Sequence, residues 1–264
     1  MVNVAFLGTG GAFSAGRRSN VALLIKVNHF RMLVEAGPTV MQQLARLNPE
    51  PAEVENLFIS HSHGDHALGF PMLALNRIET QAPLHVYAGP STIHTLQGLW
   101  TLAYPGLDID RINLYWHPLS EQDPQVTVLA EGIVLRTVPV PHPPPVPTLA
   151  ARWDLAGGLS TAFATDTVPN VATVGLAYGC DLLIHEASYS AVLQPEDDAG
   201  KYFHSTAQQA GEIARLAGCA RLALVHLGPE TGEHPDVLAE EARAGTDLQV
   251  IVPEDGECIH LGDR

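Results

Sequence analysis

The sequence predicts an α+β protein in which two mixed β-sheets pack face to face and helices cover their outer faces. Short apolar segments typical of strands alternate with helical patterns in both halves of the chain, which favours two layered halves. The 23 glycines and 20 prolines are spread along the chain, as in proteins with many short strands joined by turns. With 264 residues, of which 46% are hydrophobic, the chain can bury a full core, and we expect a single domain spanning residues 1–264.

Each predicted element follows from local composition and periodicity. The helix at 207–217 is the clearest, because Ala210, Ile213 and Ala217 share one face and Gly218 ends it. Strands are expected at residues 2–7, 21–27, 31–35, 57–60, 84–88, 133–138, 148–153, 160–165, 182–186, 221–225, 248–252 and 258–261. Helices are expected at residues 40–47, 67–77, 92–104, 171–178, 207–217 and 236–244.

The segment His61-Ser62-His63-Gly64-Asp65-His66 concentrates four metal-ligating side chains in one short turn. It lies between the predicted strand at 57–60 and the predicted helix at 67–77, where a rigid scaffold can aim side chains at one point. Imidazole and carboxylate together suit Zn²⁺, Mn²⁺ or Fe²⁺, and these four groups exceed what one open catalytic zinc needs from a single loop. The spacing therefore indicates that His61 and His63 bind one metal, whereas Asp65 and His66 bind a second.

This motif resembles the His-x-His-x-Asp-His signature of the metallo-β-lactamase-fold hydrolases. The resemblance implies an αβ/βα four-layer sandwich with a dinuclear metal site along the sheet edges. It also implies three further ligands, each just past an apolar strand: His142, Asp166 and His226. In this pattern one metal is held by His61, His63 and His142, the other by Asp65, His66 and His226, and Asp166 bridges them. The implied cofactors are two divalent ions, with Zn²⁺ expected first and Mn²⁺ also compatible with these ligands.

Three other segments resemble the ribonuclease Z-like branch of that superfamily. The segment from Leu7 to Phe13 resembles its N-terminal strand and turn, and Phe13 stands where a dinucleotide-binding loop would have its third glycine. The segment His185-Glu186-Ala187-Ser188-Tyr189 resembles its His-Glu-Ala-Thr-Tyr segment, and residues 204–210 resemble its His-Ser/Thr-x-x-x-Ala helix start. The resemblance implies that His204, oriented by Glu186, acts near the leaving group. Asp65 is expected both to bind metal and to orient the nucleophile.

One feature of ribonuclease Z is missing from this sequence. That enzyme carries a long arm between its third histidine and its bridging aspartate, and the arm grips the transfer RNA elbow. Here only residues 143–165 separate His142 from Asp166, and two predicted strands and their turns fill them. In addition, 29 acidic residues against 14 basic ones give a net charge of −15, which repels polyanions. The sequence therefore disfavours a nucleic-acid partner and favours a small anionic ester as the substrate.

The expected function is that of a dinuclear metal-dependent hydrolase, a phosphodiesterase that attacks a small phosphodiester with a hydroxide held between the metals. Three alternatives stay open. The first is transfer RNA 3′-end processing without the arm. The second is an arylsulfatase-like or lactonase-like ester hydrolase, and the third is a non-catalytic metal-dependent carrier or sensor.

The remaining expectations concern location and assembly. Cys180, Cys219 and Cys258 form no CxxC pair and lie in or beside apolar segments, which predicts buried, reduced thiols. The chain has no signal-like N-terminus and no apolar stretch of about 18 residues, so we expect a cytoplasmic protein that does not cross a membrane. Residues 187–203 form either a lid over the site or an ordinary solvated loop. The family resemblance implies a homodimer.

Overall fold

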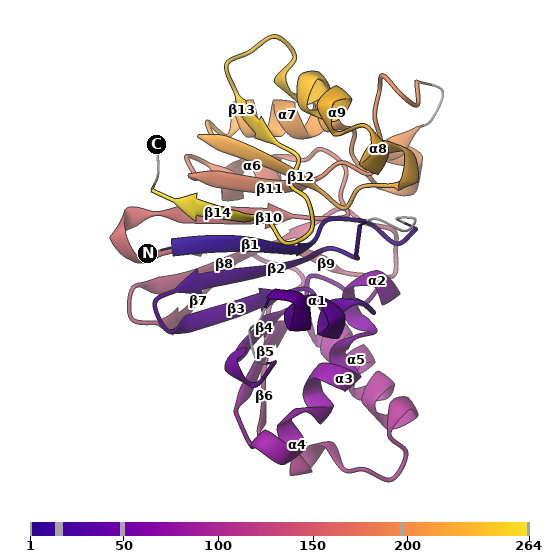
Figure 1. The fold of residues 1–264 in the computed structure, drawn as a ribbon, viewed down its shortest axis with the longest axis vertical. Helices are drawn as coiled ribbons and strands as arrows, with labels where there is room; N and C mark the ends of the chain where they lie inside the picture. Colours follow the sequence, from indigo (N-terminus) through magenta and orange to yellow (C-terminus); the bar gives the residue numbers. More distant parts are fainter. Residues whose placement is uncertain (1, 14–17, 48–50, 196–197, 263–264) are drawn as a thin grey trace.

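The computed structural model describes residues 2–13, 18–47, 51–195 and 198–262, and it has the predicted α+β sandwich of two sheets (Figure 1). The described residues form two seven-stranded sheets, ordered β14-β1-β2-β3-β4-β5-β6 and β13-β12-β11-β10-β9-β8-β7. Both sheets are mixed, because antiparallel pairs at one side of each sheet give way to parallel pairs at the other. Strands from both halves of the chain therefore face each other across one interface.

The first sheet contains the N-terminal strands and the C-terminal strand of the described chain. Its members are β1 (Val2–Gly8), β2 (Ala22–Val27), β3 (Phe30–Val34), β4 (Asn56–Phe58), β5 (Leu84–Ala88), β6 (Leu114–Pro118) and β14 (Cys258–Leu261). Its helical segments are α1 (Val40–Leu47), η1 (Pro51–Glu53), α2 (Gly64–Ala67), α3 (Phe70–Leu75), α4 (Arg77–Thr80), α5 (Pro90–Ala103) and η2 (Ile109–Arg111). Apolar side chains of α1, α3 and α5 pack with the outward-facing residues of this sheet in one buried cluster.

The second sheet is built from the C-terminal half. Its members are β7 (Gln125–Ala130), β8 (Ile133–Val140), β9 (Thr148–Asp154), β10 (Ser160–Ala164), β11 (Leu182–Glu186), β12 (Arg221–Val225) and β13 (Gln249–Ile251). Its helical segments are η3 (Ala156–Gly158), α6 (Val171–Ala177), η4 (Ala199–Tyr202), α7 (Ala207–Leu216), α8 (Pro229–Glu233) and α9 (Pro235–Arg243). Helices α7 and α9 cover the outer face of this sheet, which completes the four layers.

The two sheets meet in a dry core made by alternate residues of the facing strands. Phe58 of β4 and Trp153 of β9 pack edge to face across it, with ring centroids 5.6 Å apart and an interplanar angle of 89°. Burial of each such ring stabilises the fold by about 1.5–3 kcal/mol. Near the site, the amide of Leu149 donates a hydrogen bond to the carbonyl of Ser60 at 3.1 Å. This contact ties the second sheet to the loop that carries the histidine motif.

The predicted helix at 67–77 is wrong in its extent, because the chain there forms three short helices, α2, α3 and α4. The break after α2 falls at Gly69, where a Cβ atom would lie only 2.2 Å from the carbonyl oxygen of Gly37. The amide of Gly69 donates to the carbonyl of Ala36 at 2.8 Å and not to a carbonyl of α2, so the helical hydrogen bonds stop here. The close approach to Gly37 leaves no room for a side chain at this position. This contact holds the motif-bearing turn against the segment that follows β3.

The sequence patterns missed β6 and β7, which are edge strands of the two sheets, and the short helix α8. Both strands are only partly buried in the described structure. In β7 the alternation is reversed, because Val126 and Val128 are exposed whereas Gln125 and Thr127 are partly buried. The expected burial of all three cysteines was also wrong, because Cys180 and Cys219 are buried but Cys258 is exposed. In the described part of the chain, no helix combines the length and apolarity needed to cross a membrane.

Candidate dinuclear metal centre

The predicted ligands converge at one edge of the sandwich because most of them follow the carboxyl ends of neighbouring strands. Strands β10, β11 and β12 are parallel, and β8 runs in the same direction because both β8 and β10 pair antiparallel with β9. Such ends meet at one sheet edge, which is where open α/β folds bind ligands. His142, Asp166 and His226 follow β8, β10 and β12, while the histidine motif follows β4 of the opposite sheet.

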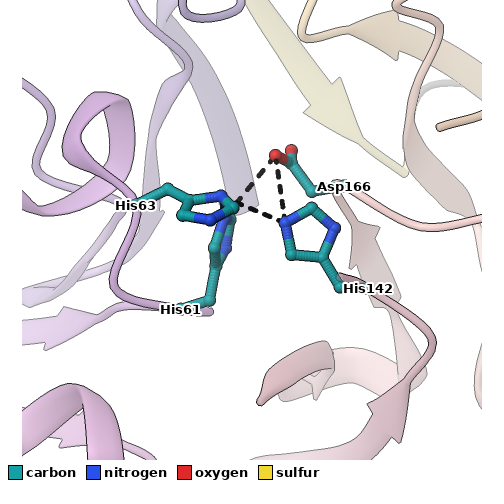
Figure 2. A group of neighbouring side chains, drawn as sticks. All are labelled: His61, His63, His142 and Asp166. Carbon is teal, nitrogen blue, oxygen red and sulfur yellow. Dashed lines mark hydrogen bonds and ion pairs between the residues drawn. The ribbon is translucent and has the colours of Figure 1, made fainter. Parts of the chain in front are cut away.

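The first ligand cluster joins His61, His63, His142 and Asp166 (Figure 2). The Nδ1 atom of His63 lies 3.1 Å from the Nε2 atoms of both His61 and His142. Oxygen Oδ2 of Asp166 lies 3.6 Å from Nε2 of His61 and 4.0 Å from Nε2 of His142. Three imidazole nitrogens and one carboxylate oxygen therefore lie around a common centre that could hold a metal ion.

The second cluster contains Asp65, His66, His226 and the same Asp166. Nε2 of His226 lies 3.1 Å from Oδ2 of Asp65 and 3.2 Å from Oδ1 of Asp166. Nε2 of His66 lies 3.2 Å from Oδ2 of Asp65 and 3.4 Å from Oδ2 of Asp166. Asp166 thus offers its two oxygens to two adjacent sets of ligands, which is the position that a bridging carboxylate requires.

The chemistry of these donors fits two divalent cations. Five imidazole and two carboxylate groups make up the two clusters, and this mixture suits Zn²⁺ or Mn²⁺. Both ring nitrogens of the buried His66 face carboxylates without hydrogen-bond geometry, Nδ1 at 3.5 Å from Oε2 of Glu35 and Nε2 at 3.2 Å from Oδ2 of Asp65. Ser60 Oγ lies 2.8 Å from Nδ1 of His61. When Nδ1 carries the proton and donates it to Ser60, the Nε2 lone pair of His61 faces the first cluster.

The pKa values of His61, His142 and Asp166 favour ligand forms at neutral pH. His66 differs, because burial lowers its pKa but Asp166 and Glu35 outweigh burial and raise it well above its ordinary value. Burial lowers the pKa of His142 to about 4, and burial together with the neighbouring His66 holds the pKa of His61 well below its ordinary value. Burial opposes ionisation of Asp166, but His226 and His66 overcome it and hold the pKa of this carboxyl well below its usual range. Neutral imidazoles and an ionised carboxylate are the states that bind a metal cation.

Backbone strain also concentrates here. Seven non-glycine residues in the described chain have positive φ, and four of them belong to or adjoin this site: Glu35, Asp166, Phe203 and His226. Asp166 has φ of 47° and His226 has φ of 55°. A left-handed conformation at such residues costs on the order of 1 kcal/mol each and is typical of functional sites. The surrounding fold therefore holds these ligands in conformations that the isolated chain disfavours.

His204 and Glu186 form a charged pair beside the second cluster. Nδ1 of His204 donates to Oε1 of the fully buried Glu186 at 2.9 Å. Burial lowers the pKa of His204, but the Glu186 carboxylate outweighs it and raises the pKa to about 9. The backbone amide of Thr167 also donates to Oε1 of Glu186 at 2.9 Å, which fixes the carboxylate. The imidazole of His204 is therefore protonated at neutral pH and lies close to both clusters.

The sequence analysis missed a role for Ser188, which connects this pair to the metal ligands. Its Oγ atom donates to Oε2 of Glu186 at 2.7 Å and lies 2.9 Å from Nδ1 of His226. When Nδ1 of His226 carries a proton and donates it to Ser188 Oγ, the lone pair on Nε2 of His226 faces the second cluster. The available signal was its place in the His-Glu-Ala-Ser-Tyr segment, where the family has threonine.

Glu35 is a second residue that the sequence analysis missed. It directly follows β3, is fully buried, and lies with Oε2 3.5 Å from Nδ1 of His66. The backbone amide of Ser60 donates to Oε1 of Glu35 at 3.2 Å. Glu35 therefore orients the ligand His66 through its Nδ1 atom. It also fixes the backbone at Ser60, where the motif loop begins. A carboxylate at the end of an apolar strand, as in Glu186, was the signal for this role.

We expect Glu35→Gln to weaken binding at the second cluster by about 10–100-fold, the usual range for a residue that orients a metal ligand. The amide is similar in shape but removes the charge that faces His66. Competition titration with a chromophoric chelator measures this affinity. Glu53→Gln is the matched control, because Glu53 forms a surface ion pair with Arg31 at 3.4 Å. Equal affinities in the two variants would contradict the supporting role of Glu35.

The glycine-rich turn after β1 packs directly on a ligand. A Cβ atom on Gly11 would lie 3.0 Å from Cε1 of His226, tighter than nearly all such contacts. The backbone amide of Gly11 donates a hydrogen bond to the carbonyl of Leu227. The backbone amide of Leu227 donates in turn to the carbonyl of Thr9. The turn therefore packs against His226 and is hydrogen-bonded to the residue that follows it. Gly11 is needed for this close packing, and the turn is not a dinucleotide-binding loop.

The candidate lid at 187–203 contributes directly to a cavity beside the site. Ser188, Tyr189, Gln194 and Tyr202 line it, and residues 196–197 of the segment lie outside the described chain. His204 and His226 form part of the same wall.

Comparisons with known proteins agree with this geometry. The family model described as anti-Pycsar protein Apyc1 matches residues 2–197. The ribonuclease Z of Halorubrum lacusprofundi is 28% identical over 304 aligned positions, which cover 98% of this chain and 97% of that protein.

The metallo-β-lactamase-fold protein YhfI from Bacillus subtilis superimposes with a TM-score of 0.81 at 23% identity, covering 98% of each chain. Human tRNase Z, short form, gives a TM-score of 0.78 at 22% identity, covering 98% of this chain and 99% of that one. The predicted metallo-β-lactamase fold is confirmed.

Proposed function

The chain belongs to the family of the anti-Pycsar protein Apyc1, and we propose that it is a phosphodiesterase that hydrolyses a small phosphodiester. It resembles the ribonuclease Z-like branch over almost its whole length and is a metal-dependent hydrolase of ester bonds. The observation that carries the proposal is the 2.9 Å hydrogen bond between His204 and the buried Glu186, beside two ligand clusters that share Asp166. This arrangement supports attack on an ester and protonation of its leaving group at one site.

The residues divide the chemistry between them. When bound, divalent cations at the two clusters would neutralise phosphoryl oxygens and lower the pKa of water to near neutral. Asp166 fixes the separation of the clusters through its two oxygens, and Asp65 lies where it can orient the attacking water. His204 keeps a proton at neutral pH and can donate it from Nε2 to a departing alkoxide, because Nδ1 is engaged by Glu186.

A small substrate fits the remainder of the molecule better than a polymer does. Between His142 and Asp166 the structure contains only β9, η3, β10 and short connections, so no arm projects from this region. The alignment to the Halorubrum relative extends over 304 positions, more than the 264 residues of this chain, so that relative has residues that this chain lacks. The net charge of −15 opposes binding of a long polyanion.

The proposal is tested with bis(p-nitrophenyl) phosphate and protein reconstituted with Zn²⁺ or Mn²⁺. We expect metal-dependent release of p-nitrophenolate, and we expect Asp166→Ala to abolish it. If protein with both metals bound gives no release, the phosphodiesterase proposal fails. Sulfate esters and lactones would then be assayed, and inactivity on these as well would favour a non-catalytic carrier or sensor.

Transfer RNA 3′-end processing is a second candidate, favoured by the curated relatives named ribonuclease Z. Its test is cleavage of a 3′-extended transfer RNA at physiological salt, since weak electrostatic binding is lost at that ionic strength. Cleavage with a kcat/KM above that for small diesters would make the RNA the preferred substrate.

A further inference from the structure

Two buried cysteines of the second sheet lie in contact, at the edge opposite the metal centre. The Sγ atoms of Cys180 and Cys219 are 3.4 Å apart, and the two residues are only 1% and 8% exposed. Cys180 comes just before β11 and Cys219 just before β12, whose carboxyl ends lead to the metal ligands. The pair is therefore separated from the ligand clusters by the length of two strands.

The backbone holds the two cysteines side by side. Strands β11 and β12 are parallel, with Leu183 opposite Leu222. Continued three residues toward the amino ends, this register places Cys180 opposite Cys219. The amide of Ala220 donates to the carbonyl of Cys180 at 3.0 Å, so the two segments are still hydrogen-bonded at this point. Neighbouring strands lie about 4.8 Å apart, which is inside the range of about 4.4–6.8 Å between Cα atoms that a disulfide can bridge.

The surroundings favour oxidation of these thiols over metal binding. Among the described residues, no cysteine belongs to a group of three or more potential metal ligands, whereas a structural zinc takes four. Gly179 and Gly218 adjoin the two cysteines and are exposed, and a Cβ atom on either would meet nothing within 4 Å. Each thiol therefore lies one residue beneath the surface, within reach of an oxidant as small as hydrogen peroxide.

A positive charge lies near the pair. Arg152 donates from Nη1 to the carbonyl of Tyr178 at 2.7 Å, in the turn that leads to Cys180. A neighbouring cation favours the thiolate, which is the form of cysteine that attacks a peroxide. The site therefore combines two adjacent sulfurs with a group that promotes their reaction.

We propose that Cys180 and Cys219 are a modification site at which hydrogen peroxide forms an intramolecular disulfide. One thiolate attacks the peroxide, the O–O bond breaks, and this sulfur becomes a sulfenic acid while the first water leaves. The second thiolate then attacks the sulfenic sulfur, so that the S–S bond forms and the second water leaves. Each sulfur gives up one electron, the peroxide accepts both, and the two thiol protons end in water.

The disulfide joins the far ends of two helices that start at the metal centre. Helix α6 follows Asp166 and helix α7 follows His204, and each ends three residues before one of the cysteines. The starts of the helices are already linked, because Ser205 Oγ donates to the carbonyl of Thr167 at 2.6 Å. The bond closes a loop between positions 39 residues apart, which lowers the entropy of the unfolded chain. For a protein of this size we expect Tm to rise by about 5–10 °C.

The experiment treats Zn²⁺-reconstituted protein with hydrogen peroxide and maps its cysteines. After denaturation and alkylation with N-ethylmaleimide, non-reducing mass spectrometry should find a cross-linked peptide that contains Cys180 and Cys219. Before alkylation the intact chain should be lighter by two hydrogen atoms, and its Tm should be higher by the amount given above. Dithiothreitol should reverse all three changes. Cys258→Ser is the matched control and should keep them, because Cys258 is exposed and outside the pair. Cys219→Ala should abolish them.

Several results would overturn the proposal. Both thiols might still react with N-ethylmaleimide after peroxide treatment, or oxidation might stop at a sulfinic acid on one sulfur. A disulfide between Cys258 residues of two chains in place of the internal one would also contradict it. If Cys219→Ala does not fold, the peptide map of Cys258→Ser decides, since only the proposed pair remains in that variant. An internal disulfide that leaves Tm unchanged would refute the stabilising link between the two helices.

Discussion

Replacing Asp166 with Asn is expected to disrupt both metal sites at once and to reduce hydrolysis to the background rate. Asp166 directs Oδ1 toward His226 and Oδ2 toward His66 and His61, so one side chain serves both clusters. Removing a residue that only orients a ligand lowers metal affinity by about 10–100-fold. Removing a ligand that both metals share should lower metal affinity by more than this. Metal analysis after gel filtration, together with the assay on bis(p-nitrophenyl) phosphate, measures both effects.

The control for this variant is Asp154→Asn, the same change at a carboxylate away from the site. Asp154 pairs with Arg136 at 2.6 Å and with Arg152 at 2.7 Å on the second sheet. It should leave metal content and turnover unchanged. Circular dichroism verifies that both variants are folded. If Asp166→Asn keeps two bound ions with normal affinity, Asp166 is not a bridging ligand.

His204→Ala is expected to lower turnover of a diester with a poor leaving group by about 10²–10⁴-fold, the usual contribution of a general acid. Metal content should stay the same, because His204 belongs to neither of the two clusters that share Asp166. The loss should be much smaller with p-nitrophenolate, since this leaving group needs little protonation. Steady-state rates for the two kinds of diester give the comparison. Unchanged turnover of the poor-leaving-group substrate would rule out this role for His204.

The protonation of His204 provides an independent check. In metal-free protein, NMR titration should give a pKa of about 9 for this imidazole, and Glu186→Gln should lower it because the facing carboxylate is lost. A raised pKa means that the proton, and the interaction with Glu186, is present below this pH and is lost as the pH rises through it. Bound cations oppose protonation, so activity of the loaded enzyme should decline on the alkaline side at a lower pH. A pKa that Glu186→Gln does not change would show that the pair is not coupled.

The sequence patterns could indicate that these seven side chains lie together because most of them follow the ends of apolar strands. His142, Asp166 and His226 each follow a segment whose composition identifies a strand, and parallel strands bring such positions together. The structure places all seven predicted ligands in the two clusters. The order of the strands in each sheet and the position of Asp166 between the two clusters depend on pairing between distant segments. Local composition does not predict such pairing.

The residues that the sequence missed act through contacts that only the folded chain creates. Glu35 supports His66 because β3 and β4 lie side by side, and Ser188 joins Glu186 to His226 because β11 and β12 do. The helix at 67–77 was predicted as continuous because a single glycine lowers helix stability by only about 1 kcal/mol, whereas in the fold the amide of Gly69 donates to the carbonyl of Ala36 and leaves the helix. Periodicity describes one segment at a time, whereas these features belong to pairs of segments.

The pairing of β1 with β14 has a consequence for how the protein is made. Val2 is opposite Leu261 in this pair, so β1 lacks this partner until the distant segment that forms β14 has been made. Until then the emerging N-terminal sheet has an open edge, which favours sticking to other nascent chains. The second metal cluster is likewise incomplete until His226 has left the ribosome. Contacts of such high sequence separation form slowly, so we expect the second cluster to load metal only after the segment that carries His226 has joined the second sheet.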